Sequence, residues 1–275
     1  MEMPRRSVNF RLAPRAELLA AFDAQMRGPM SLKLPDGAHE EQDGPVFRSW
    51  GSAPRGCVLP GDLHALDAHQ LDTLIQGQIK FFAERSLAFE WKTYAHDQTA
   101  QLTFRLRRAG FVPEARENLV IGRLSELNQT PQLPAGVSLR QVRSRADTNR
   151  MADLLTEVEG EDCRSLGEQF FKDAEVNPDH VVLLVAEAGA KVIGTARVNL
   201  EPGAEFATLW AGSTLPKWRS QGIYRATVAY RARLAAERGY QYLQVDASEE
   251  SRPILERLGF LTVSSTTPYV WSPAT

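Results

Sequence analysis

The chain has 275 residues, of which 43% are hydrophobic and 24% charged, and its formal net charge is −2. That composition is typical of a globular protein and leaves room for one large or two ordinary domains. No Lys- or Arg-rich run suits a nucleic-acid backbone, and no stretch of about 18 apolar residues is available to span a membrane, so neither partner is expected. The N-terminal arginines are not followed by an apolar run with a small-residue cleavage site, which predicts a cytoplasmic protein.

The sequence lacks the patterns of several common reaction centres. Cys57 and Cys163 are too few for a disulfide framework and are not spaced as metal ligands. The five histidines are scattered, so no metal site is expected. There is neither a Gly-x-Ser-x-Gly elbow nor a Walker-type Gly-Lys-Ser/Thr motif, which argues against a hydrolase triad and a P-loop.

Periodicity and turn residues predict alternating helices and strands over the first half of the chain. Residues 28–45, rich in Pro, Gly and Asp, predict a loop, and residues 126–136, with two prolines, one glycine and no periodicity, predict a linker. The predicted helices are 14–26, 67–85 and 99–109, and the predicted strands lie in 46–59, 89–95 and 119–124.

The second half predicts an antiparallel meander that leads into a parallel strand–helix–strand unit. A tight turn at residues 188–190 joins the two longest strands of the meander. The predicted strands are 137–141, 181–187, 191–200, 206–215 and 240–247, and the predicted helices are 147–159, 166–175, 223–238 and 249–258.

The most informative stretch is the junction between the strand that starts at Phe206 and the helix that starts at Ile223. Pro216 ends the strand, and Gly222 stands at the helix entrance. The first turn of a helix has unpaired N–H groups at the positive end of its dipole, which together suit a phosphate or pyrophosphate. The alternative is that Gly222 is an ordinary turn residue and that Arg219 and Arg225 form a solvated basic face.

The two halves of the chain repeat one pattern. Leu-Pro precedes a helix ending Ala-Glu-Arg in both, at residues 59–85 and 215–238, and LRRAGF at 106–111 matches LERLGF at 255–260. Two tandem copies of one α/β unit are the simplest explanation, and coincidence of common dipeptides is the alternative. After Pro60 the first copy reads GDLHAL (residues 61–66), with no arginine, no glycine matching Gly222, and an acidic Asp62, which disfavours an anion.

The second copy resembles the GNAT superfamily of acyl-CoA-dependent N-acetyltransferases. The resemblance rests on a strand, Leu-Pro, Trp-Arg-x-x-Gly, a helix, a strand, a helix and Leu-Gly-Phe in this order. In that family an Arg/Gln-x-x-Gly-x-Gly/Ala loop holds the pyrophosphate of coenzyme A. Arg219 and Gly222 match the loop, whereas Tyr224 stands where the family usually has Gly or Ala.

The resemblance implies an α/β fold of two tandem GNAT-like domains, each a mixed, mostly antiparallel sheet with helices on both faces. The expected division is a degenerate copy without a cofactor loop at 1–125, a linker at 126–136 and an acyl-CoA-binding domain at 137–275. The family also implies that two parallel strands splay apart to admit the pantetheine arm of acetyl-CoA. The expected cofactor-binding residues are Gly212, Ser213, Thr214, Arg219, Ser220, Gln221, Gly222, Ile223, Tyr224, Arg225 and Ser248.

Direct attack of an amine on the thioester needs a base and can use an acid for the departing thiolate. The tyrosine that the family often supplies as the acid corresponds to Leu255, and the asparagine usual before that helix corresponds to Ser248. Asp246, at the end of its strand, is the candidate base, and its alternative role is to cap the following helix. Glu187 and Tyr269 are weaker candidates.

The sequence therefore predicts an N-acetyltransferase for a primary amine of a small molecule or peptide, as a monomer or homodimer. A non-catalytic acyl-CoA sensor or interaction module is one alternative, because the usual tyrosine is missing. A different phosphate ligand in the same loop, such as a nucleotide, is another. Substrate specificity is expected to depend on the helices within 147–175 and on the contact between the copies.

Overall fold

The computed structural model describes residues 13–29, 31–97, 99 and 101–273. Helices and strands alternate along the first half. In chain order they are α1 (Ala13–Met26), β1 (His39–Asp43), β2 (Val46–Trp50), β3 (Gly56–Pro60), α2 (Ala68–Ala83), β4 (Phe89–Tyr94), α3 (Leu102–Arg108), β5 (Val112–Pro113) and β6 (Glu117–Arg123).

The second half begins after residues 124–136, which contain neither helix nor strand. A single 3₁₀ turn, Pro216–Trp218, lies within this half. Its other elements are β7 (Val137–Gln141), α4 (Arg145–Glu159), α5 (Arg164–Val176), β8 (Val181–Ala188), β9 (Lys191–Leu200), β10 (Phe206–Thr214), α6 (Ile223–Glu237), β11 (Tyr242–Ala247), α7 (Arg252–Arg257) and β12 (Leu261–Trp271).

All of these strands form one sheet, in the order β1-β2-β3-β4-β12-β6-β11-β10-β9-β8-β7, with β5 paired to β12. The pairs β3–β4 and β10–β11 are parallel, and the other pairs of described strands are antiparallel. Each parallel pair is connected through one helix, α2 in the first half and α6 in the second. The repeat expected from the sequence is therefore present as two β–α–β units within a mixed, mostly antiparallel sheet.

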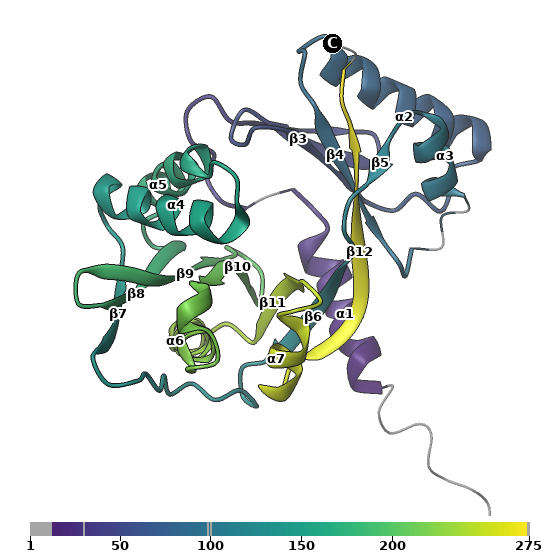
Figure 1. Ribbon diagram of the computed structural model, residues 1–275. Helices are drawn as coiled ribbons and strands as arrows, with labels where there is room; N and C mark the ends of the chain where they lie inside the picture. The colour runs from purple at the N-terminus through teal and green to yellow at the C-terminus, as the bar shows by residue number, and fades with distance from the viewer. Residues whose placement is uncertain (1–12, 30, 98, 100, 274–275) are drawn as a thin grey trace, which may run out of the picture.

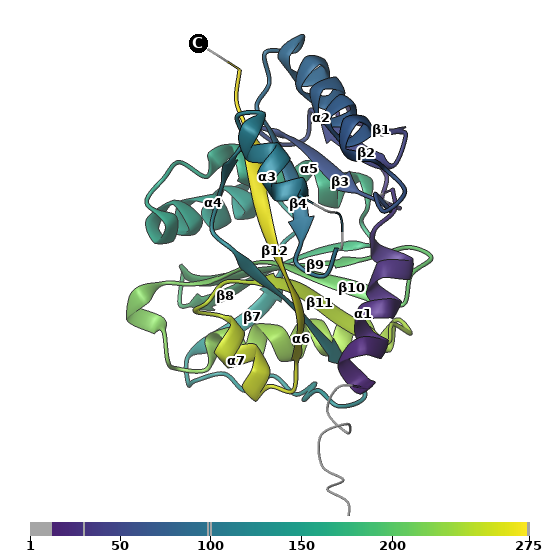
Figure 2. The ribbon, with the colours of Figure 1, turned by 90° about the vertical axis from the view of Figure 1, so that its right-hand side faces the viewer.

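The two halves exchange their last strands (Figure 1). β6, from the first half, lies between β11 and β12, with Leu119 opposite Asp246. β12, from the second half, pairs with β4 of the first, with Thr266 opposite Tyr94. Figure 2 shows β12 running from the second half into the first. Each half thus supplies a strand that the other needs to complete its sheet.

Four hydrophobic clusters hold the helices on the sheet. Alternating residues of β8 separate two of them, because Val182 packs with α6 and α7 while Leu183 packs with α4 and α5. The third cluster joins α2 and α3 to β3 and β4. The fourth places Phe22 of α1 against Phe206 of β10, beside residues of β4 and β6. Helix α1 therefore covers the place where the two halves meet, as Figures 1 and 2 show.

The structure confirms the type and order of most predicted elements and corrects several bounds. The loop predicted over residues 28–45 was wrong in part, because β1 pairs with β2 inside it. The helix predicted at 249–258 begins only at Arg252, and the one predicted at 99–109 is α3, Leu102–Arg108. No strand was predicted after Phe260, yet β12 is the longest strand described. The division of the chain at residues 126–136 stays a prediction.

The strand exchange predicts that the halves do not fold apart. Residues 1–125 alone lack β12 and with it Tyr269, which is 4% exposed in the core of the first half. Residues 137–275 alone lack β6, so one side of β11 is left as an open edge. We expect neither piece to unfold cooperatively by circular dichroism when expressed alone, and the two to copurify as a 1:1 complex when coexpressed. A monomeric, cooperatively unfolding 137–275 piece would contradict this.

Candidate functional site

The parallel strands β10 and β11 separate in the middle of the sheet. Their pairing runs from Phe206–Tyr242 to Thr208–Gln244 and stops there. β10 then bulges between Trp210 and Ser213 on its β9 side. Beyond Thr208 the other edge of β10 has no partner strand among the described residues. The opening predicted from the sequence is therefore formed by the end of the β10–β11 ladder.

The predicted residues Gly212, Ser213 and Thr214 lie on this part of β10. Gly212 is exposed, and Thr214 is buried at 9% exposure. The hydroxyl of Thr214 has no hydrogen-bond partner among the described atoms. A buried hydroxyl without a partner costs free energy, so this edge lacks a polar group that a ligand would supply.

The loop after β10 presents a row of free backbone donors. Ser220 has φ +62° and Gly222 has φ +86°, so the chain turns through left-handed conformations before α6 starts. Among the described residues, no backbone or side-chain acceptor pairs with the amides of residues 220–225. Such successive N–H groups form an anion-binding concavity at the positive end of a helix. The exposed Arg219 adds a positive charge next to them and donates from Nε to the Thr214 carbonyl at 3.3 Å.

The equivalent helix of the first half is closed to an anion. The carboxylate of Asp67 accepts hydrogen bonds from the amides of His69 and Gln70, both at 2.8 Å, in a capping box at the start of α2. Asp62 is likewise occupied, because it accepts from the amide of His64 at 2.9 Å. Here a side-chain anion already fills the position that is free in front of α6, which has Gly222 and no side-chain cap.

Tyr224 spans the opening from the side of α6. A Cβ added at Gly212 would lie 2.9 Å from Cε2 of its ring, so the ring rests directly on the β10 backbone. Burial raises the pKa of the phenol. A residue predicted to act through its amide therefore also places a large side chain beside the opening.

A buried arginine supports the bulge from below. Arg231 of α6 is 1% exposed, and its guanidinium donates to the carbonyls of Arg197 and Thr227, each at 3.0 Å, and of Trp210 at 3.4 Å. Burial lowers its pKa to about 10, and no carboxylate among the described residues pairs with it. The sequence analysis missed Arg231, although an arginine within the apolar stripe of α6 was a visible signal.

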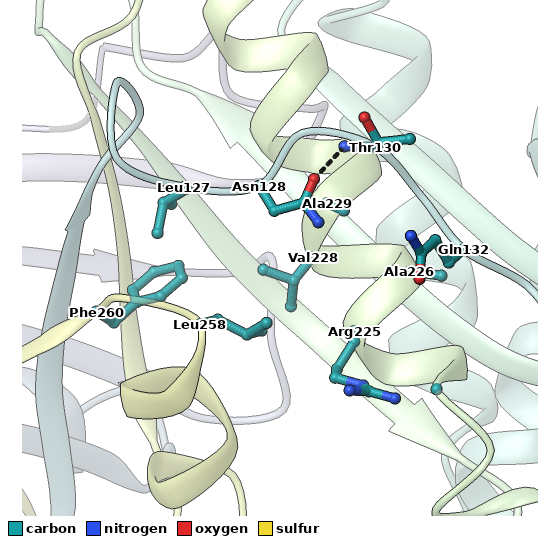
Figure 3. A pocket seen from close by; sticks show the side chains of 11 residues that line it. Leu127, Asn128, Thr130, Gln132, Arg225, Ala226, Val228, Ala229, Leu258 and Phe260 are labelled. Carbon is teal, nitrogen blue, oxygen red and sulfur yellow. Dashed lines mark hydrogen bonds between the residues drawn. The ribbon is translucent and has the colours of Figure 1, made fainter.

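An open pocket of about 100 Å³ lies beside the loop, where the segment after β6 passes over α6 (Figure 3). Gly222 and Arg225 belong both to the predicted cofactor loop and to the wall of this pocket. Leu258 and Phe260 lie on the side of the pocket opposite Arg225 in Figure 3. Gln132 is one of the linker residues that line the pocket. The predicted linker therefore contributes to the site as well as joining the halves.

Asp246 lies on the side of the opening that faces away from α6. Its carboxylate forms an ion pair with Lys92 of β4 and accepts from the Gln244 amide at 3.3 Å. Burial is the largest single influence on Lys92 and lowers its pKa, but the charge of Asp246, the field of Tyr94 and the hydrogen bond to Asp246 together outweigh it, so the pKa is raised. The alternative that Asp246 caps α7 was wrong, because the Ser251 amide donates to the Ser248 hydroxyl at 3.2 Å instead.

The remaining candidates are placed elsewhere. Leu255, at the position of the family tyrosine, is fully buried in the core with α6. Glu187 on β8 is held by Arg140 and Arg150. Tyr269 is buried in the core of the first half. None of these three side chains supplies a free polar group to the opening.

No group of three or more His, Cys, Asp or Glu side chains in the described ranges is arranged to hold a metal ion. Within those same ranges no helix is both long and apolar enough to cross a bilayer.

Residues 148–260 match the acetyltransferase (GNAT) family. A GCN5-related N-acetyltransferase from Kribbella flavida has a similar structure, with a TM-score of 0.65, 15% identity and 98% of each chain covered. One from Sphaerobacter thermophilus has a TM-score of 0.61 and 14% identity over 94% of this chain and 85% of that one. A tandem GNAT protein from the clavulanic acid biosynthesis pathway has a TM-score of 0.59 and 12% identity over 99% and 98% of the two chains. No curated protein sequence matches the chain.

The ion pair between the halves predicts a measurable coupling. Lys92→Met leaves the carboxylate of Asp246 without its partner at a site where the two side chains are only 17% and 11% exposed. We expect it to lower the free energy of unfolding by about 2–3 kcal/mol in urea titrations. Adding Asp246→Asn to that variant removes the unpaired charge and should recover most of the loss. A cost below about 0.5 kcal/mol for Lys92→Met would show that the pair contributes no more than a surface ion pair.

Proposed function

Because residues 148–260 match the acetyltransferase (GNAT) family, we propose that the protein transfers an acetyl group from acetyl-CoA to a primary amine of a small molecule or peptide. The observation that carries the proposal is the row of unpaired amides at residues 220–225, next to the gap between β10 and β11. An anion-binding loop beside an open strand edge suits a ligand with a diphosphate at one end and a hydrogen-bonding chain at the other.

In this proposal different residues of the site bind different parts of the cofactor. The amides of Ser220, Gln221, Gly222, Ile223, Tyr224 and Arg225 hold the pyrophosphate, with Arg219 as a neighbouring charge. The backbone of Gly212, Ser213 and Thr214 holds the pantetheine arm, and the unpartnered Thr214 hydroxyl supports a polar contact there. Ser248 stays a predicted contact at the far side of the opening, although its hydroxyl already accepts from Ser251.

The pocket in Figure 3 is the proposed place for the adenosine end of coenzyme A. It begins at Gly222, where the diphosphate is proposed to lie, and its wall combines apolar side chains with Arg225. An apolar wall suits an adenine ring, and a guanidinium suits a phosphate on the ribose.

The proposed contribution of the protein to the reaction is to position acetyl-CoA and the amine relative to each other. Acetyl-CoA supplies an activated acyl group, and the enzyme holds an amine at attack distance while a backbone N–H polarises the carbonyl. Asp246 was the base predicted from the sequence, but its carboxylate is engaged by the ammonium of Lys92. A carboxylate in that state is not free to take a proton from a substrate.

The predicted cytoplasmic location and the predicted monomer or homodimer state rest on the sequence.

One observation favours a second candidate function, a non-catalytic acyl-CoA sensor. Leu255 occupies the position of the family's acid and is 0% exposed, so that helix supplies no proton to a thiolate. Binding of acyl-CoA without turnover would distinguish the sensor from the enzyme.

Ligand binding and turnover test the proposal together. Coenzyme A should raise the melting temperature of the protein, and ATP at the same concentration should not, because a ligand specific to the folded state stabilises it by mass action. Acetyl-CoA with a panel of primary amines should release thiol, which is measured with a thiol reagent. Equal stabilisation by ATP would point to a different phosphate ligand, and stabilisation without thiol release would point to the sensor.

Gly222→Asp tests the loop itself. It introduces an anion among the free amides, at a position with φ +86°, and should weaken coenzyme A binding at least about tenfold by calorimetry. Gly203→Asp is the matched control, because Gly203 has φ +79° and open space around it in a turn away from the loop. Both variants carry similar backbone strain. Equal affinities in the two variants would mean that the loop does not bind the diphosphate.

A further inference from the structure

The strand exchange places a row of side chains from both halves beside the opening. Leu119 of β6 is opposite Asp246, so Glu117, two residues earlier, lies on the same face of the sheet. Thr266 of β12 is opposite Glu117, and Tyr94 of β4 is opposite Thr266. Glu117 is therefore a diagonal neighbour of Asp246, on the face that points away from α6.

Glu117 differs from the other carboxylates of this face in having no partner. It is half-buried, and no hydrogen bond or ion pair joins its side chain to another described residue. By contrast, Asp246 is paired with Lys92, and Glu90 is paired with Arg55. Its lone pairs are thus available to a molecule that enters this face.

A second group of this row also lacks a partner. Thr266 is 1% exposed, and its hydroxyl makes no hydrogen bond to any described atom. Because Thr266 and Glu117 are directly opposite on neighbouring strands, an unpartnered hydroxyl and an unpartnered carboxylate lie side by side. Buried polar groups are normally satisfied, so this pair fits a polar guest such as an amine.

We infer that Glu117 is the proton acceptor for the amine substrate at the site of the second half, and that the first half completes this site by donating β6. The inference rests on the proposed function, since it assigns a residue to that reaction. The first copy, which has no anion loop of its own, thereby has a direct part in the chemistry of the second.

In the proposed acetyl transfer the Glu117 carboxylate takes one proton from the substrate ammonium and leaves a neutral amine. The amine nitrogen forms a bond to the thioester carbonyl carbon, and the carbon–sulfur bond breaks. The second proton of the nitrogen passes to the departing thiolate, which gives an amide and the thiol of coenzyme A. Glu117 then returns its proton to solvent.

The electrostatics of the row suit this role. Burial, and then the negative charge of Asp246, raise the pKa of Glu117 to about 7, and Lys92 opposes the shift. The weaker fields of Glu90 and Glu114 also raise it. A base with a pKa near the working pH combines availability with driving force for proton transfer.

The pH dependence of turnover separates Glu117 from Asp246. With acetyl-CoA and the probes glucosamine, putrescine and a short peptide, wild-type kcat/KM should rise with pH through about 7. Glu117→Gln should abolish this rise and lower kcat/KM about 100-fold or more at its plateau. Asp246→Asn should keep the rise but move its midpoint downward, because a like charge beside Glu117 is removed. Glu84→Gln, at the exposed C-cap of α2 and away from the opening, is the control and should match the wild type.

The opposite pattern overturns the inference. If Asp246→Asn abolishes the rise of kcat/KM with pH, the proton acceptor is not Glu117 alone and the inference is overturned. This holds whatever Glu117→Gln does. If Glu117→Gln leaves the rise in place, it is not the acceptor at all. Coenzyme A should stabilise wild type and Glu117→Gln equally, so a lack of stabilisation in both would instead be a failure of the proposed function.

A measurement without turnover gives a separate test. Carbon-13 NMR of glutamate-labelled protein follows the Glu117 carboxyl, assigned by its loss in Glu117→Gln. A midpoint near 7 supports the inference, and a midpoint at the ordinary value of 4.5 overturns it.

The pH dependence of the protein's stability also reports whether the pKa of Glu117 is raised. The folded protein holds the proton of Glu117 more tightly than the unfolded chain, so this group's contribution to stability is lost as pH rises from about 4.5 through 7. The urea midpoint of wild type should therefore fall relative to that of Glu117→Gln between pH 5 and pH 8, and a constant difference would contradict the raised pKa.

Discussion

The main-chain pairing of β6 between β11 and β12 is the constraint on which the rest of the molecule depends. Strand pairing fixes register residue by residue, because a shift of one position would turn every side chain to the opposite face. With Leu119 opposite Asp246, the polar residues of one half come to stand beside the open edge of the other. The exchange therefore joins the strands of both halves into one sheet. It also brings residues of both copies to the surface at their junction.

The two copies share a β–α–β unit but differ in how the helix begins. In the first, Asp67 caps α2 and consumes the amides that an external anion would use. In the second, Gly222 provides no cap, and the ladder between β10 and β11 ends early at Thr208 and Gln244. An uncapped helix is less stable on its own, so the free amides of the second copy are a local cost that the proposed phosphate contact would offset. This difference is the reason for proposing the cofactor at the second copy and not at the first.

The charges at the junction follow from the same arrangement. Lys92 is carried by β4 and Asp246 by β11, yet their side chains meet across the strands that the halves exchange. On this half-buried face Lys92 pairs with Asp246 and Arg55 pairs with Glu90, which leaves the carboxylate of Glu117 without a cation among the described residues. A surplus negative group in a desolvated place binds a proton more readily than it does in water. The shifted pKa of Glu117 is thus a consequence of the topology more than of any neighbour in the sequence.

The sequence by itself determined the local features. The strand that ends just before Pro216, the glycine that opens α6 and the tight turn between β8 and β9 were readable because each depends on residues a few positions apart. It did not reveal β12, the Lys92–Asp246 pair or the buried Arg231, since these depend on contacts between distant segments. Lys92 and Asp246 are separated by 154 positions, and no periodicity records which strand will lie next to which. Only the tertiary structure decided that the halves exchange strands, because long-range pairing is selected by the packing of the whole chain and leaves no mark on the local pattern that specifies a helix or a turn.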